Sequence, residues 1–395
     1  METLYFRQPC IYLVGNQTTF RNAYIICKSG GKKLKISIGI LAYNESREIS
    51  TTLKSLFEQS IFQDANANTE IEVIVVPNGC TDDTADITQT TLQNLETSTQ
   101  NPTVSWRICE IEEAGKPNAW NLYVHQFSRP DADYLILMDA DIQFLEPKTL
   151  YQMLQTLETN SQAWISVDKL VKDVALKPQK NLMEKLSVAV SGVSGAKSTW
   201  ICGQLYCGRT HILRQIWMPK GVLVEDGFLW KMIVTDRLTS SEVLDRVILS
   251  ESAAHVFEAY TQIQSLLSHE LRQVVGNTIN DFIYSHLEID DNSSGDAGTL
   301  IKLKNEQDPL WLDKLITDNV EKNGWWTIPR GLLFRRLQSL TNRPLIKAVL
   351  LFPMFFIAFL LDLILCWQAN SHFHHWEKSR YRHKILIRKP LEVTT

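Results

Sequence analysis

A short apolar run that ends in two aspartates constrains the fold of this sequence more than any other feature. Residues Tyr134–Met138 are apolar throughout, and Asp139 and Asp141 follow directly. A run of this length is typical of a buried strand. Ligands bind at the carboxyl ends of the strands in open α/β sheets, so two carboxylates at this edge can face a common ligand. Carboxylates suit a hard divalent cation that also contacts phosphate, and the pattern therefore indicates a metal–diphosphate site, with a solvated turn as the alternative.

Strands and helices alternate along the first part of the chain. Apolar runs that read as buried strands are each followed by a polar turn and then by apolar residues at helical spacing. This alternation predicts a parallel sheet with right-handed crossovers. The strands are expected at Ile36–Leu41, Ile71–Val76, about Val104–Glu110 and Tyr134–Met138, and the intervening helices at 49–57, 83–95 and from Pro117.

Composition and charge narrow the class of protein. The 395 residues have a net charge of −4, which gives no global basic surface for nucleic acid. The seven cysteines are scattered and include no C-x-x-C pair, so we expect reduced thiols and no zinc site.

One apolar segment near the C-terminus is long enough to contact a membrane. Residues Ala348–Trp367 are interrupted only by Pro353 and Asp362. Twenty residues just reach across a bilayer, although Asp362 is costly if it faces lipid. Basic residues flank the segment on both sides, which favours a re-entrant or interfacial helix over a simple span. Spanning, lying in the interface, and burial in a protein core all stay open.

Five motifs in order carry a resemblance to a known family. They are Ile38-Gly-Ile-Leu-Ala-Tyr-Asn-Glu45, Val76-Pro-Asn-Gly-Cys-Thr-Asp-Asp-Thr84, Gly115-Lys-Pro-Asn-Ala-Trp-Asn121, Met138-Asp-Ala-Asp141 and Val224-Glu-Asp-Gly227. The chain resembles the family 2 glycosyltransferases over roughly residues 35–275. That resemblance implies a GT-A fold: a Rossmann-like, mainly parallel α/β sheet flanked by helices, here with an apolar membrane-associated helix at the C-terminal end.

The resemblance implies a nucleotide pocket at the first strand edges. Asn44 and Glu45 are expected to contact the base or ribose, with helix capping as the alternative for the same turn. Asn78 stands where the family often has Asp and can still contact the base, while Asp82 either joins the pocket or caps the next helix. Lys116 matches a family lysine beside the donor, where an ammonium can pair with a diphosphate.

The resemblance also implies the chemistry. Asp139 and Asp141 are expected to hold Mg²⁺ or Mn²⁺, with Asp139 also near the ribose, and the cation stabilises the leaving diphosphate. Asp226 is the expected base that takes the proton from the acceptor hydroxyl, and Glu225 is expected to anchor a local donor-side network. Arg272 can pair with the diphosphate or lie on a helix surface. No Trp follows it, which favours non-processive transfer.

These observations predict an inverting glycosyltransferase on the cytoplasmic face of a membrane. The expected donor is a UDP-sugar, and the expected acceptor is a lipid or glycan in glycolipid, cell-envelope or polysaccharide biosynthesis. A non-catalytic binding protein and a sugar nucleotidyltransferase are the alternatives. The expected parts are an unassigned segment (1–34), the nucleotide-sugar half (35–150), the acceptor half (151–287), a flexible loop (288–298), a basic connector (299–342), the membrane helix (343–370) and a basic tail (371–395).

Overall fold

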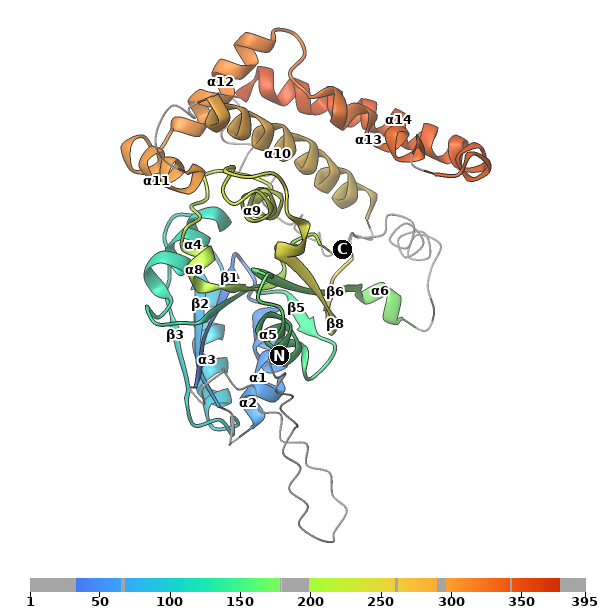
Figure 1. The fold of residues 1–395 in the computed structure, drawn as a ribbon. Coiled ribbons are helices and arrows are strands. Elements are labelled where there is room, and N and C mark those ends of the chain that lie inside the picture. The colour runs from blue at the N-terminus through green and yellow to red at the C-terminus, as the bar shows by residue number, and fades with distance from the viewer. Residues whose placement is uncertain are drawn as a thin grey trace, which may run out of the picture.

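The computed structural model describes residues 33–64, 68–177, 179, 199–259, 262–289, 296–341 and 343–376. It contains one eight-stranded sheet with helices on both faces, and a further layer of helices built from the C-terminal part of the chain (Figure 1). Most of the unassigned segment 1–34 and the basic tail beyond residue 376 lie outside these residues.

The sheet is parallel on one side and mixed on the other. Its strand order is β3-β2-β1-β4-β7-β6-β8-β5. β1, β2, β3 and β4 run parallel, as the alternating pattern predicts, whereas β7 is antiparallel to both β4 and β6. The strand bounds are β1 Leu34–Ala42, β2 Thr69–Pro77, β3 Val104–Ile108, β4 Tyr134–Asp139, β5 Ile142–Phe144, β6 Ile165–Lys172, β7 Leu205–Arg209 and β8 Val247–Phe257.

Alternate residues along the strands pack into two separate apolar cores, one on each face of the sheet. Leu135 and Leu137 of β4 belong to one apolar cluster, and Ile136 and Met138 belong to the other. Because successive side chains of a strand point to opposite faces, a strand covered on both faces must be apolar throughout. This is the physical reason for the uninterrupted apolar run before Asp139.

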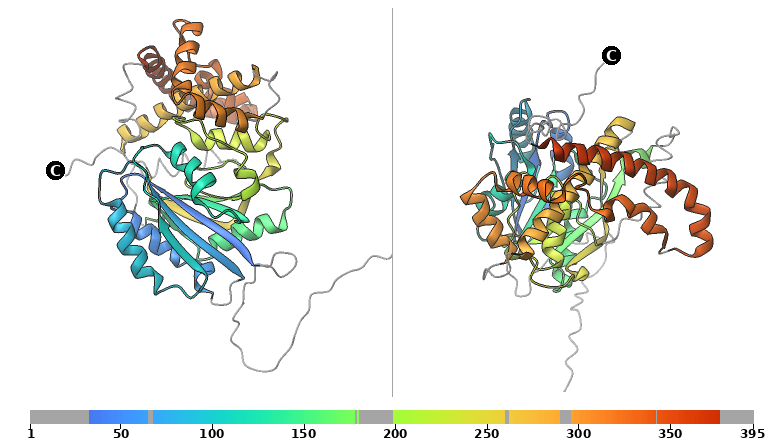
Figure 2. Two further views of the ribbon diagram at one scale, coloured as in Figure 1. Left: turned by 90° about the vertical axis from the view of Figure 1, so that its left-hand side faces the viewer. Right: turned by 90° about the horizontal axis from the view of Figure 1, so that it is seen from above.

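The helices divide between the two faces and the outer layer. Residues of α1, α2 and α5 pack in the cluster on one face, while residues of α4, α8, α9 and α10 pack in the other cluster together with the C-terminal helices. Figure 2 shows the helical layer lying on one side of the sheet only. The helices are α1 Ile49–Phe57, α2 Ser60–Gln63, α3 Thr84–Glu96, α4 Lys116–Leu122 with the π-helical turn η1 Tyr123–Phe127, α5 Thr149–Thr159, α6 Asp173–Leu176, α8 Thr210–Leu213, α9 Glu225–Val234 with the 3₁₀ turn η2 Leu244–Arg246, α10 Ile263–Ile289, α11 Ala297–Gln307, α12 Trp311–Asn323, α13 Arg330–Thr341 and α14 Leu345–His374.

Helices in the second half of the chain extend into the expected flexible loop at 288–298. Helix α10 continues to Ile289 and α11 begins at Ala297, and residues 290–295 lie outside the described residues. Strand β6 continues to Lys172 through its parallel pairing with β8.

The apolar C-terminal segment forms one long helix. α14 extends beyond the expected twenty residues at both ends, and Lys347–His374 is long and apolar enough to cross a membrane, a property that core helices of soluble proteins share. Few residues of Lys347–His374 are buried in the structure.

Candidate active site

The two aspartates of the apolar run lie at the carboxyl edge of the parallel strands. Asp139 is the last residue of β4, where it pairs in register with Leu41 of β1. Its backbone N–H donates to the carbonyl of Gln204, at 2.9 Å, so the segment before β7 lies directly beside it. Asp141 follows before the short strand β5 begins. The expected placement of this pair at a sheet edge is confirmed.

Lys116 joins this edge to a second acidic segment. Its Nζ atom lies 2.6 Å from Oδ1 of Asp139 and 3.0 Å from Oε1 of Glu225. Burial lowers the pKa of Lys116, but the two carboxylates outweigh burial and hold the pKa well above its usual range. Burial also raises the pKa of Asp139 to about 6, with Lys116 opposing the rise and Asp141 adding to it. The lysine is therefore a fixed cation between two acidic elements.

Glu225 and Asp226 form the first turn of α9. Burial raises the pKa of Glu225, but Lys116 and Arg272 outweigh it and hold the pKa below its usual value. Burial and the neighbouring charge of Glu225 raise the pKa of Asp226. Oδ1 of Asp226 accepts a hydrogen bond of 2.8 Å from the N–H of Gly227. Two adjacent carboxylates thus have opposite pKa shifts: Glu225 forms ion pairs with Lys116 and Arg272, whereas at Asp226 the same two cations are outweighed by burial and by the charge of Glu225.

Arg272 of α10 holds the segment that leads into α9. Its Nε and Nη2 atoms donate to the carbonyl of Leu223 at 3.1 and 2.9 Å. Nη2 also lies 3.5 Å from Oε2 of Glu225. The guanidinium therefore ties helix α10 to the turn that presents Glu225 and Asp226.

A glycine makes room for the charged cluster. The carbonyl of Gly203 accepts a hydrogen bond of 3.1 Å from Lys116 Nζ. A Cβ atom at Gly203 would lie 3.1 Å from Oε1 of Glu225 and 3.2 Å from Lys116 Nζ. The close approach of three segments here depends on the missing side chain. A narrow pocket beside it has Lys116, Glu225 and Asp226 at its polar side and an apolar wall that includes Trp120, Met218 and Leu229.

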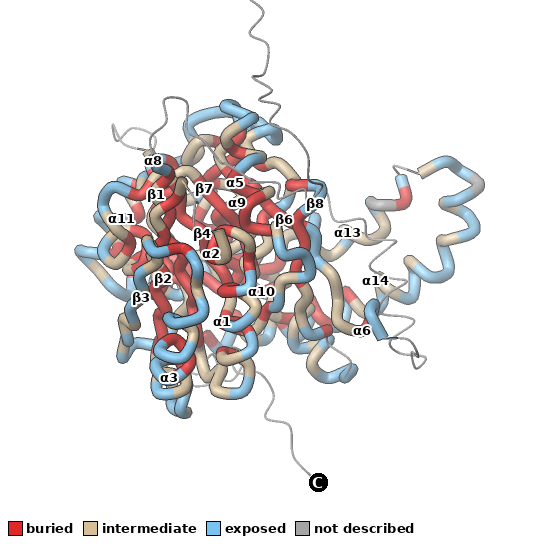
Figure 3. Tube along the Cα trace, turned by 90° about the horizontal axis from the view of Figure 1, so that it is seen from below, coloured by how far each residue is buried: buried red, intermediate tan, exposed pale blue. Residues whose placement is uncertain are grey.

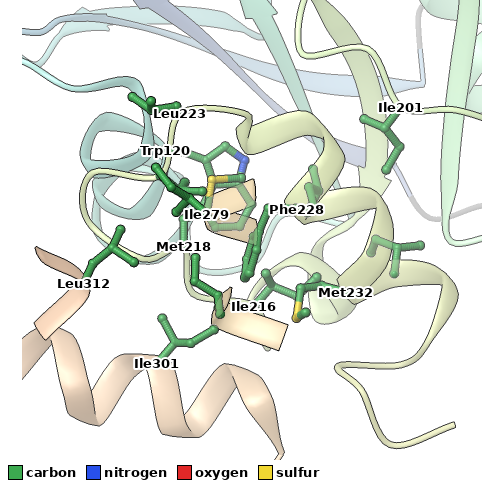
Figure 4. Close-up of a cluster of buried hydrophobic side chains, with 14 of the residues drawn as sticks. Trp120, Ile201, Ile216, Met218, Leu223, Phe228, Met232, Ile279, Ile301 and Leu312 are labelled. Atoms are coloured by element: carbon green, nitrogen blue, oxygen red, sulfur yellow. The ribbon is translucent and has the colours of Figure 1, made fainter. Parts of the chain in front are cut away.

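Buried apolar side chains fix the helices that carry this cluster. Trp120 of α4, Phe228 of α9 and Ile279 of α10 meet in one core with side chains of α11 and α12 (Figure 4). Trp120 also donates from Nε1 to the hydroxyl of Tyr206 in β7 at 2.6 Å. Packing at native density leaves little freedom for the helix ends that hold Lys116 and Asp226.

The loops after β1 and β2 interlock. Asn44 has a φ of 55°, which places it in the left-handed region, and its Oδ1 accepts a hydrogen bond of 2.7 Å from the N–H of Thr81. Glu45 donates from its backbone N–H to the hydroxyl of Thr84 at 2.8 Å. Asp82 accepts from the N–H groups of Ser46 and Thr84 at 3.1 and 3.2 Å. Asn44, Glu45 and Asp82 are therefore brought together at one edge, as the sequence predicts.

Asp82 is held in its charged form. Burial raises the pKa of Asp82, but hydrogen bonds from Thr84 and Ser46 outweigh it, so the pKa lies below its usual value. Its bond to the N–H of Thr84 lies at the start of α3, where Asp83 and not Asp82 occupies the N-cap position.

Asn78 has a different environment from the one expected. Its side chain is 2% exposed. Its Nδ2 donates to the carbonyl of Ala42 at 2.7 Å, and its Oδ1 accepts from the N–H of Gly115 at 3.1 Å. Asn78 thus holds the β1 edge and the Lys116 loop together, and a base contact by its side chain stays a prediction.

A buried histidine–aspartate pair lies near the same edge and was not predicted as a pair. Nδ1 of His255 lies 2.8 Å from Oδ2 of Asp168, and its Nε2 lies 3.3 Å from Oε1 of Gln204. Burial raises the pKa of Asp168, with His255 opposing the rise. Among the residues that the structure describes, no group of three or more His, Cys, Asp or Glu side chains is arranged to hold a metal ion.

Sequence reasoning missed Gly203, Gln204 and Asp168. All three lie on β6 or in the segment that leads into β7, and no local motif marks them. The only signal for them is the topology, because the antiparallel strand β7 enters the sheet beside β4 and places Gln204 next to Asp139.

Comparison with known proteins agrees with the motifs. Residues 37–196 match the model of the family described as "Glycosyl transferase family 2". A mannosyltransferase from Pyrobaculum calidifontis, solved with GDP-Man and Mn²⁺, is 15% identical over 88% of each chain, with a TM-score of 0.48. A glucosyl-3-phosphoglycerate synthase from Mycobacterium tuberculosis, solved with Mg²⁺ and uridine diphosphate, is 18% identical over 61% of this chain and 76% of that chain, with a TM-score of 0.40. The match over residues 37–196 shows that the chain carries a glycosyl transferase family 2 domain and is a glycosyltransferase.

Proposed function

We propose that this glycosyltransferase moves a sugar from a nucleoside-diphosphate sugar to an acceptor hydroxyl with inversion at the transferred carbon. The observation that supports the proposal most strongly is the ion pairing of Lys116 with both Asp139 and Glu225. It joins the sheet edge where nucleotides bind in open α/β folds to the helix turn that carries Asp226. The residues proposed to bind the donor and the residue proposed to act as the base thus belong to one site.

Asp139 and Asp141 fit a divalent cation. Their carboxylate oxygens are the ligands that Mg²⁺ and Mn²⁺ prefer. Burial is the larger cause of the raised pKa of Asp139, and the charge of Asp141 adds to it, so a cation bound here would favour the ionised carboxylates. When bound, the cation neutralises charge that develops on the leaving nucleoside diphosphate. Lys116 lies at the same edge and is positioned to contribute a second positive charge to the diphosphate.

Asp226 is the proposed base. An inverting transfer needs one group that takes the proton of the acceptor hydroxyl as the oxygen attacks. The raised pKa of Asp226 increases its affinity for that proton. Glu225 is not the proposed base, since its pairing with Lys116 and Arg272 lowers its pKa and makes it a weaker proton acceptor. Glu225 instead fixes the turn on which Asp226 lies.

The nucleotide pocket is proposed at the interlocked loops. Asn44, Glu45 and Asp82 lie together at the edge of β1 and β2, and a UDP-sugar is the expected donor. Asn78 supports the pocket by joining the loops. Arg272 uses Nε and Nη2 to hold Leu223, and a guanidinium carries five donors, so Nη1 is compatible with the expected diphosphate contact.

The acceptor is proposed to be a lipid or a lipid-linked glycan at the cytoplasmic face of a membrane, in glycolipid, cell-envelope or polysaccharide biosynthesis. The support is the exposed apolar surface of α14, which belongs to the same layer of helices as α10. An active site next to the bilayer favours acceptors that are anchored in the bilayer.

The test is donor turnover by purified full-length protein. UDP-, GDP- and dTDP-sugars are each incubated with Mn²⁺, with Mg²⁺ or with chelator, beside the variant Asp141→Ala. We expect metal-dependent release of one nucleoside diphosphate, lost in the variant. Release that is unaffected by both chelator and Asp141→Ala contradicts the proposed metal site, and no turnover of any donor with a full acceptor panel contradicts the proposed reaction.

A further inference from the structure

Helices α13 and α14 form an antiparallel hairpin that extends beyond the rest of the molecule (Figures 1 and 3). The rings of Phe334 in α13 and Phe359 in α14 stack with centroids 5.7 Å apart. Nearer the turn, the guanidinium of Arg343 lies 5.4 Å from the ring centroid of Phe355. The two helices therefore hold each other along the extension, in which most residues are exposed or only partly buried.

The outer part of α14 is apolar in every direction. Side chains more than 40% exposed occur at successive positions around the helix, among them Val349, Leu350, Met354, Ile357 and Leu360. Helices that are apolar all round occur in protein cores or in lipid. Because this part of α14 is exposed, a protein core does not account for its composition. A continuous exposed apolar surface of this kind marks an interaction site.

The inner part of α14 is fixed to the body of the protein. Leu365, Cys366, Ala369 and Phe373 are buried at helical spacing, and the ring of Phe373 contacts that of Phe282 in α10 with centroids 6.0 Å apart. These buried residues share one face of the helix. The C-terminal end of α14 is therefore packed against α10 and the body of the protein.

Further hydrogen bonds hold that end against the segment around α12. The Oδ1 of Asn370 accepts from the N–H of Thr327 at 2.7 Å. The Nε1 of Trp376 donates to Oδ1 of Asp313 at 3.0 Å. The chain that leads into α13 and the chain that ends α14 are thus tied together at the base of the hairpin.

A neutral ion cluster closes the base. Arg335 Nη2 and Arg336 Nε each lie 2.9 Å from Asp362, on its two different oxygens. Both arginines also pair with Oε2 of Glu270 in α10, at 2.8 and 3.0 Å. The side chain of Asp362 is 1% exposed. Two acids and two arginines balance, so the aspartate within the apolar helix does not need to face lipid.

The length of the hairpin limits how far it can reach. From Leu345 to Asp362 the helix rises about 26 Å, at ~1.5 Å per residue, which is less than the ~30 Å hydrocarbon core of a bilayer. The tip of the hairpin carries Arg343 and Lys347, whose charges are costly in hydrocarbon and favour an anionic headgroup region, so the hairpin lies along the near leaflet and does not cross the bilayer. Trp325 and Trp367, 79% and 68% exposed, add indoles of the kind found at membrane interfaces.

We propose that the α13–α14 hairpin is a one-sided membrane anchor. Its apolar outer part enters the near side of a phospholipid bilayer with anionic headgroups, and the chain returns, so the catalytic body and the C-terminal tail stay on the same side. The inference rests on the proposed membrane association, but it is independent of the proposed chemistry.

The first part of the test is flotation. Full-length protein is mixed with preformed vesicles of phosphatidylcholine and phosphatidylglycerol and centrifuged through a density gradient. Leu360→Glu is compared with Leu303→Glu, because Leu360 in α14 and Leu303 in α11 are 43% and 44% exposed. We expect the protein and Leu303→Glu to float and Leu360→Glu to bind at least tenfold more weakly. Equal flotation of both variants overturns the inference, as does a wild-type protein that dimerises through α14 and does not float.

The second part of the test is topology. Trypsin added outside the vesicles can reach the five cleavable basic residues from Lys378 to Arg388 only if the tail is outside. We expect mass spectrometry to show that these sites are cut while the protein remains bound. Flotation with the tail protected overturns the one-sided anchor and leaves membrane association intact. Absence of flotation overturns both the one-sided anchor and the membrane association. Donor turnover measured in solution tests the proposed chemistry separately.

Discussion

The Nζ atom of Lys116 lies 3.0 Å from Oε1 of Glu225, although the two residues are more than a hundred positions apart in the chain. Because Lys116 also pairs with Asp139, this contact connects the carboxyl edge of β4 to the first turn of α9. Buried charges are costly unless they are paired, so the ion pairs of Lys116 with the two carboxylates must form together as the protein folds.

Removal of the Lys116 charge should impair transfer more than it impairs folding. We expect Lys116→Met to lower kcat/KM by about 10²-fold, the usual effect of losing one electrostatic stabiliser in an active site. The matched control is Lys220→Met, since Nζ of Lys220 lies 3.8 Å from Glu113 in an exposed pair. Steady-state rates of both variants, measured where circular dichroism shows them folded, check this. Equal rates for the two variants contradict it.

The pH dependence should report the raised pKa of Asp226. A base must be deprotonated to accept a proton, so activity rises with pH through this pKa, with a midpoint above the ordinary value for aspartate. Burial is the larger cause of the rise, and the charge of Glu225 adds to it. Glu225→Gln should therefore move the midpoint of kcat/KM to lower pH. Glu242→Gln, which removes the exposed partner of Lys231 in α9, should leave it unchanged.

Gly276 should be required for the position of the α9 turn. A Cβ atom there would lie 2.3 Å from Cγ2 of Val224, the residue before Glu225. We expect Gly276→Ala to lower the free energy of unfolding by about 1–3 kcal/mol through overpacking. Gly331→Ala in α13 has no atom within 4 Å of the new Cβ and should stabilise by about 0.5–1 kcal/mol. Denaturant melts measure the free energy of unfolding of both variants. No change in this free energy for Gly276→Ala contradicts the packing described.

Asp362 should stabilise the protein as the partner of two arginines. Its removal in Asp362→Ala leaves Arg335 and Arg336 without this carboxylate, and we expect a loss of roughly 3 kcal/mol in the free energy of unfolding, at the low end for a buried pair because the arginines are partly exposed. Glu306→Gln breaks the exposed pair with Lys302 and should change stability by less than about 0.5 kcal/mol. Similar losses in the two variants, measured by denaturant melts in detergent, are incompatible with this role.

The sequence predicts those parts of the site that depend on local order. The β4 run and its two aspartates are found because a strand covered on both faces is apolar throughout and ends at the ligand edge. The loops with Asn44 and Asp82 follow from the same alternation of strands and helices. The Glu225–Asp226 pair was found only through the family resemblance, because no local period marks it.

The remaining features depend on which distant segments meet. Gln204 and Gly203 come to Asp139 only because β7 pairs antiparallel with β4. Arg272 holds the Leu223 carbonyl, a contact that no spacing indicates. The arginines that neutralise Asp362 lie in the preceding helix, so the cost of that charge cannot be judged from α14 alone.

Donor binding through Asp139 and transfer through Asp226 should belong to one site. Calorimetry with Mn²⁺ measures donor binding, and a transfer assay measures activity, in the full-length variants Asp139→Asn and Asp226→Asn. We expect Asp226→Asn to bind donor as the native protein does but to lose transfer by about 10²–10⁴-fold, the range for a lost general base. We expect Asp139→Asn to lose metal-dependent binding and transfer together. Transfer at the native rate by Asp226→Asn, or unchanged metal-dependent binding by Asp139→Asn, would show that the two residues do not act in this way.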